Sequence, residues 1–118
     1  MAIRTKRVYE EAEEADGLRV LVDRLWPRGL SKEKAGIALW LKDLAPSTEL
    51  RKWYGHDPAR WEEFKARYFR ELDRHGETVA ELVDEARAGT VTLLFSSREQ
   101  KFNNAVALKE YLERRTHG

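Results

Sequence analysis

The chain has 118 residues, the size of one domain, and its 22 lysines and arginines nearly balance 21 aspartates and glutamates. The resulting net charge of +1 argues against a strongly basic nucleic-acid binder. The absence of cysteine excludes disulfides, cysteine-ligated zinc and thiol catalysis, and no apolar run approaches the roughly 20 residues of a membrane span. With no visible signal peptide, we expect a cytoplasmic protein.

The first part of the chain predicts two strands joined by an acidic loop. Residues 3–9 alternate loosely between polar and apolar side chains, as in a short strand. Residues 10–16 include five acids, whose charge is expected to keep this loop in water up to the turn signal at Asp16-Gly17. Residues 18–23 are largely apolar and rich in valine and leucine, which predicts a buried strand.

Short elements follow in the next part of the chain. Ser31 is expected to cap a short helix that runs through Ala35, and residues 38–41 predict a short strand. Ser47 or Thr48 then caps a helix that Gly55 ends.

The second half of the chain predicts longer helices around one strand. Asp57-Pro58 starts a helix with an apolar face that ends at Gly76, and the next helix ends at Gly89. Residues 90–95 form a continuous apolar strand, and Asn103 or Asn104 caps the last helix. Strands that alternate with helices predict an α/β fold, namely a single small domain with a short, mainly parallel sheet flanked by helices.

Ligands of such sheets bind beyond the carboxyl ends of the strands, so we expect residues 23–29, 42–48 and 96–104 to meet. Arginine forks suit phosphate, serine hydroxyls can hydrogen-bond it, and a helix N-terminus favours an anion. One tryptophan lies in a loop beside two arginines, where its ring could stack on a ligand. We therefore predict a site for a small anionic, phosphate-bearing ligand formed by Arg24, Trp26, Arg28, Lys42, Ser47, Ser96, Arg98 and Asn103.

Catalysis is left open at this point. Asp23 and Asp43 are candidates for a general base, although a raised pKa cannot be seen in a sequence. His56, His75 and His117 are scattered without ligand-like spacing, so we expect surface or capping roles and no metal site. Without a glycine-rich phosphate loop, no cofactor can be named.

Two alternatives compete with the ligand site. In one, the chain is a partner-binding or nucleic-acid-associated module whose basic residues share one face: Arg4, Lys6, Arg7, Arg114 and Arg115. In the other, the turn that contains Arg24 and Arg28 is structural, with arginine–aspartate pairs fixing it against the sheet. Four tryptophans and an apolar helix face would also suit a homodimer.

Three stretches of the sequence carry a family resemblance. Residues 20–29 read VLVDRLWPRG after Asp16-Gly17, residues 46–52 read PSTELRK, and residues 92–96 read TLLFS. In this order they resemble the YeaO-like bacterial proteins, which contain domain of unknown function 488. The resemblance covers nearly the whole chain and implies one YeaO-like α/β domain over residues 1–118, with no established activity or substrate.

Two departures from the YeaO-like pattern concern groups that can titrate. The family often has tyrosine where this chain has Phe95, and an Asn-His pair where it has Asn103-Asn104. The loss of a phenol and an imidazole weakens any mechanism that needs a general acid or base there. These departures therefore favour binding over catalysis.

Overall fold

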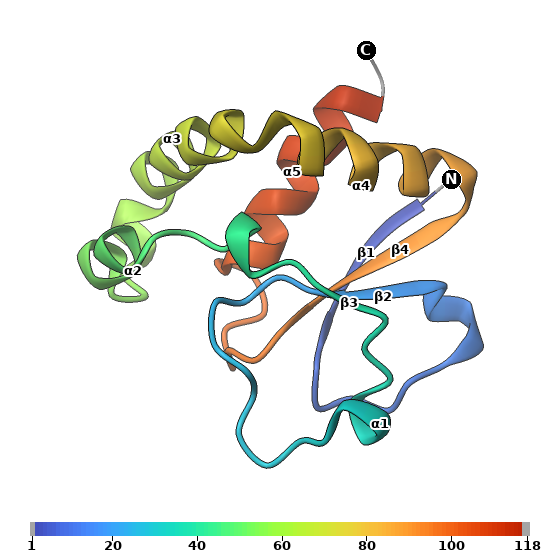
Figure 1. Cartoon of the computed structure of the whole chain (residues 1–118). Helices are drawn as coiled ribbons and strands as arrows, with labels where there is room; N and C mark the ends of the chain where they lie inside the picture. Colours follow the sequence, from blue (N-terminus) through green and yellow to red (C-terminus); the bar gives the residue numbers. More distant parts are fainter. Residues whose placement is uncertain (1, 117–118) are drawn as a thin grey trace.

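The computed structural model describes residues 2–116 and shows an α/β fold on a four-stranded parallel sheet (Figure 1). The strand order is β1-β4-β2-β3. The strands are β1 (Ala2–Arg7), β2 (Leu18–Leu21), β3 (Leu39–Trp40) and β4 (Thr90–Phe95). The predicted fold class and parallel sheet are confirmed, and β4 occupies the predicted residues.

The sheet is covered on both faces (Figure 1). The longer helices pack on one face against Val91, Leu93 and Phe95, while Leu21 and Leu94 pack on the other face near the short helix α1. The α-helices are α1 (Lys32–Ala35), α2 (Thr48–Tyr54), α3 (Trp61–Leu72), α4 (Gly76–Ala88) and α5 (Asn104–Thr116). The 3₁₀ turns are η1 (Glu14–Asp16), η2 (Lys42–Leu44), η3 (Pro58–Arg60) and η4 (Asp73–His75). No helix within residues 2–116 is both long and apolar enough to cross a membrane.

Most helix ends follow the predicted caps, but the predicted stop at Gly76 is wrong. Ser31 and Ser47 cap α1 and α2, and Gly55 ends α2 with a φ of 53°. Gly76 has right-handed helical angles (φ −53°, ψ −39°) and begins α4, because η4 carries the chain on from α3 without a break. Gly55 ends α2 by adopting a positive φ, which Gly76 does not adopt.

The two predicted strands joined by an acidic connection are present as β1 and β2, and β4 lies between them in the sheet. The expectation that the whole connection stays in water is wrong at Asp16, which is fully buried. Gly17 next to it has a φ of 62°, and a Cβ atom there would lie 2.3 Å from the carbonyl oxygen of Thr90. A glycine is therefore required where the acidic segment packs against β4.

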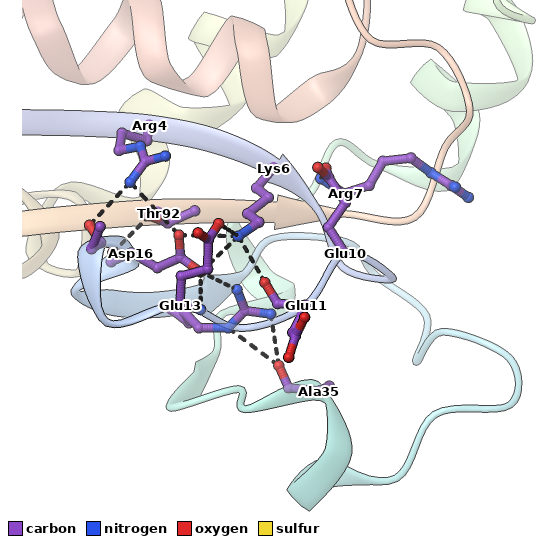
Figure 2. Close-up of polar contacts among 11 residues, drawn as sticks. Arg4, Lys6, Arg7, Glu10, Glu11, Glu13, Asp16, Ala35 and Thr92 are labelled. Atoms are coloured by element: carbon purple, nitrogen blue, oxygen red, sulfur yellow. Dashed lines mark hydrogen bonds and ion pairs between the residues drawn. The ribbon is translucent and has the colours of Figure 1, made fainter.

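Asp16 is the centre of a buried ion cluster, formed by Lys6, Asp16 and Arg19. Figure 2 shows Lys6 beside Asp16. Its carboxylate accepts hydrogen bonds from Lys6 Nζ at 3.1 Å and from Arg19 Nη1 at 2.5 Å. Thr92 Oγ1 donates to its carbonyl at 2.6 Å, and the Arg19 guanidinium donates to the carbonyl of Ala35 at 2.7 and 3.2 Å. The cluster thus joins all three longer strands to the end of α1.

The cluster holds two cations and one carboxylate, and the carboxylate of Glu13, 2.7 Å from Lys6 Nζ, balances the second cation. The exposed fractions of Asp16, Arg19 and Lys6 are 0%, 4% and 9%. Burial would raise the pKa of Asp16, but hydrogen bonds from the backbone of Glu13 and from Lys6 and Arg19 outweigh it and hold the pKa below its usual 3.8. The pKa of Lys6 is raised, chiefly by its hydrogen bond to Glu13. The chain thus has a structural ionic network, but it lies at the acidic segment and not at the turn that contains Arg24 and Arg28.

Candidate functional site

A cleft of about 880 Å³ lies beyond the carboxyl ends of β1, β2 and β4. The structure brings the three predicted segments together there, because the cleft is lined by residues 23–28, by residues 45, 46 and 48, and by residues 96–98 and 102–104. In Figure 1 this is the region where the chain leaves β2 and β4, below α2. The cleft therefore lies at the edge where parallel sheets bind ligands.

Asp23 links three segments at the base of the cleft through hydrogen bonds. Its Oδ2 accepts hydrogen bonds from the backbone N–H and the hydroxyl of Ser96, at 2.9 and 2.8 Å. Its Oδ1 accepts from Asn104 Nδ2 at 3.1 Å, and the same amide donates to the carbonyl of Val22 at 3.0 Å. Asp23 therefore ties the end of β2 to the end of β4 and the start of α5.

Two arginines brace the walls of the cleft through backbone carbonyls. Arg24 donates to the carbonyls of residues 45–46 at 3.3 and 3.4 Å, just before α2. Arg7, at the end of β1, donates to the carbonyls of residues 96–97, both at 3.0 Å. These guanidiniums hold the loops in place, and among the described residues neither forms an ion pair.

Four further cations line the cleft and are exposed: Arg28, Arg51, Lys52 and Arg98. Within residues 2–116 their side chains have no hydrogen bond and no carboxylate within 4.0 Å. Asp23 is the one acidic residue that lines the cleft in the described part of the chain. A chain whose net charge is only +1 thus concentrates positive charge at this edge of the sheet.

Three predicted site residues do not line the cleft: Lys42, Asp43 and Ser47. Lys42 and Asp43 lie exposed on η2, with Lys42 Nζ 5.3 Å from the ring centre of Trp40. Ser47 Oγ accepts from the backbone of Leu50 at 3.1 Å and donates to Glu71 at 2.7 Å. Ser47 is therefore a helix cap, and η2 directs Lys42 and Asp43 away from the cleft.

Two other predicted residues line the cleft with their polar groups already engaged. Asn103 is buried, accepts from the backbone of Val106 at 2.9 Å and donates to the carbonyl of Glu99 at 2.7 Å, so it caps α5. Trp26 Nε1 donates to the carbonyl of Leu30 at 2.7 Å, and its half-buried ring packs edge-on against Trp40. Both residues shape the cleft.

Sequence reasoning missed Arg7, Arg51, Lys52 and His56 among the lining residues. Arg7 could have been found, because it ends a strand of the parallel sheet whose carboxyl edge forms the site. Arg51 and Lys52 lie three and four residues after Thr48, so all three residues are on the same face of α2.

The histidines separate into three cases. His56 is exposed and lines the cleft, with a φ of 57° that non-glycine residues seldom adopt. His75 is half-buried in η4, away from the cleft, and His117 lies outside the described residues. The hydroxyl of Ser96 donates to Asp23 and not to His56, so the described residues form no serine–histidine pair.

Comparisons with known proteins place the sequence among relatives of unknown activity. The model of a family described as "Inactive DUF488-N3 subclade" (DUF488-N3i) matches residues 2–118. The uncharacterised protein YeaO of Escherichia coli strain K12 is 41% identical over 112 residues, which cover 95% of this chain and 97% of YeaO. Uncharacterised proteins of Mycobacterium bovis (Mb3100c) and Mycobacterium tuberculosis (Rv3073c) are each 42% identical over 113 residues, covering 96% of this chain and 95% of theirs. No solved structure matches the chain.

Proposed function

We propose that this chain, which belongs to the inactive DUF488-N3 subclade of the YeaO-like proteins, binds a small phosphate-bearing ligand in the cleft without turning it over. The observation that carries the proposal is that, within residues 2–116, the cleft has four exposed cations without partners and one carboxylate, which already accepts three hydrogen bonds. A hydrogen bond from a charged donor to phosphate is worth about 1.5–3 kcal/mol. Two or three such contacts would support specific binding.

The geometry of the carboxylates supports binding over catalysis. Asp23 already accepts three hydrogen bonds, and Asp43 lies outside the cleft. Asn104, at a position where the YeaO-like pattern often has histidine, donates to Asp23 and cannot titrate. Neither Asp23 nor Asp43, the two candidates from the sequence, is therefore available as a free general base in the cleft.

The nucleic-acid alternative has less support, because most of its basic residues have partners. Lys6 is buried in the ion cluster, and Arg7 braces the loop after β4. Arg114 pairs with Glu110, and Arg115 with Asp73. A cytoplasmic location and a homodimer stay predictions.

Binding is tested by thermal shift and calorimetry with inorganic phosphate, ribose 5-phosphate and AMP. A ligand at 100 times its Kd adds about 2.7 kcal/mol, which raises Tm by roughly 10 °C in a domain of this size. Arg28→Ala is expected to weaken binding about tenfold or more, because it removes one charge-assisted contact.

Arg74→Ala is the matched control, because Arg74 is an exposed arginine on η4, away from the cleft. It is expected to bind like the wild type. A flat panel, or the same loss of affinity in Arg74→Ala, would overturn the proposal.

A further inference from the structure

The cleft combines its cations with exposed apolar side chains. Three large hydrophobic side chains are exposed among residues 2–116: Leu25 at 67%, Tyr9 at 42% and Leu39 at 42%. Leu25 and Tyr9 both line the cleft, whereas Leu39 lies on the edge strand β3. Leu25 also stands in the same turn as Arg24 and Arg28. A ligand that covers this turn would remove apolar surface from water as well as neutralise charge.

The hydrogen-bonding groups on the cleft floor are used within the protein. The Asp23 carboxylate is engaged by Ser96 and Asn104, and the Asn103 amide caps α5. A ligand rich in hydroxyls would need free acceptors, and besides its cations and apolar side chains the lining leaves few other polar side chains exposed, namely Thr48 and His56. This arrangement favours a phosphate attached to a group with a large apolar face over a phosphate attached to a bare sugar.

From this pairing, and resting on the proposed function, we infer that the ligand is a phosphomonoester that carries a planar heteroaromatic ring, of the mononucleotide type. The cleft of about 880 Å³ falls within the roughly 300–1,000 Å³ of small-molecule sites and far exceeds the needs of a lone phosphate ion. The cations hold the phosphate, and the ring covers Leu25. Exposed guanidiniums such as Arg28 and Arg98 can also stack on a planar ring.

The test compares the Kd values of AMP, UMP, ribose 5-phosphate and hexyl phosphate, measured by calorimetry. We expect at least one nucleotide to bind tenfold or more tightly than ribose 5-phosphate and hexyl phosphate. Leu25→Ser should remove most of that advantage while leaving ribose 5-phosphate binding unchanged. Arg28→Ala should weaken the nucleotide and ribose 5-phosphate by similar factors, since it acts on the phosphate.

Leu39→Ser is the matched control, because it replaces another exposed leucine, which lies outside the cleft. Its Kd values should equal those of the wild type. If ribose 5-phosphate or hexyl phosphate binds as tightly as both nucleotides, the inference is wrong and the proposed function stands. If none of the four compounds nor inorganic phosphate binds, both are wrong. Because Leu25 is exposed, Leu25→Ser should unfold at the wild-type urea midpoint.

Discussion

Replacing Asp16 with alanine is expected to lower the free energy of unfolding by about 3–5 kcal/mol, the usual cost of removing one partner from a buried ion pair. The substitution leaves Lys6 and Arg19 buried with fewer acceptors, and those two charges are only 9% and 4% exposed. Urea unfolding followed by tryptophan fluorescence at pH 7 measures the loss. Asp16→Asn, which keeps the shape and removes the charge, should lose part of it and covers the case in which the alanine variant does not fold.

Glu14→Ala is the matched control, because Glu14 is an exposed acid in the same 3₁₀ turn. Its free energy of unfolding should stay within about 0.5 kcal/mol of the wild-type value, the range of ordinary surface substitutions. A loss below 1 kcal/mol in both Asp16 variants would show that the cluster is not a main source of stability.

The same carboxylate predicts a pH dependence. Because the folded pKa of Asp16 lies below its usual 3.8, the stabilisation is fully present above that value and is lost as the pH falls through the folded pKa. The pKa of Lys6 is raised, so its contribution is present below 10.5 and is lost as the pH rises through the folded pKa. Between these limits, from about pH 5 to pH 9, the cluster should contribute a constant amount. Asp16→Asn should lack the acid-side loss.

Replacing Asp23 with alanine is expected to lower the free energy of unfolding by about 1.5–3 kcal/mol, the range for hydrogen bonds to a charged group. Asp23 is half-buried and accepts three hydrogen bonds, two of them from Ser96. The variant should also speed amide hydrogen exchange at Ser96, because its N–H donates to Asp23 at 2.9 Å. Urea unfolding and native-state hydrogen exchange measure the two effects.

Asp43→Ala provides the control, since it removes an exposed carboxylate on η2 outside the cleft. We expect it to change stability by less than about 0.5 kcal/mol. Equal effects from Asp23→Ala and Asp43→Ala would mean that Asp23 does not hold the floor of the cleft.

The sequence predicted the region of the cleft better than its individual contacts. The carboxyl ends of parallel strands share one edge, so residues after β2 and β4 could be placed together by rule. The rule does not say which way a side chain points after its strand ends. The turn η2 carries Lys42 and Asp43 outward, and a helix cap occupies Ser47.

The ion cluster could not be predicted from the sequence either, because it also depends on which way side chains point. Five acids precede Gly17, and only the packing of the segment against β4 decides that Asp16 is the one that turns inward. Its partner Arg19 lies within a strand that reads as apolar. Sequence periodicity reports burial along one element, whereas this cluster depends on contacts among β1, β2 and β4.

The most direct test of the ligand site is an NMR titration of the ¹⁵N-labelled protein with AMP and ribose 5-phosphate. Binding in the cleft predicts that the amide shifts concentrate at residues 24–28, 51–52 and 96–98, which carry the exposed cations and Leu25. They should be strongly reduced in Arg28→Ala and unchanged in Arg74→Ala. Saturating shifts confined to α4 and the far end of α5, or no shifts with either compound, would contradict a phosphate site in this cleft.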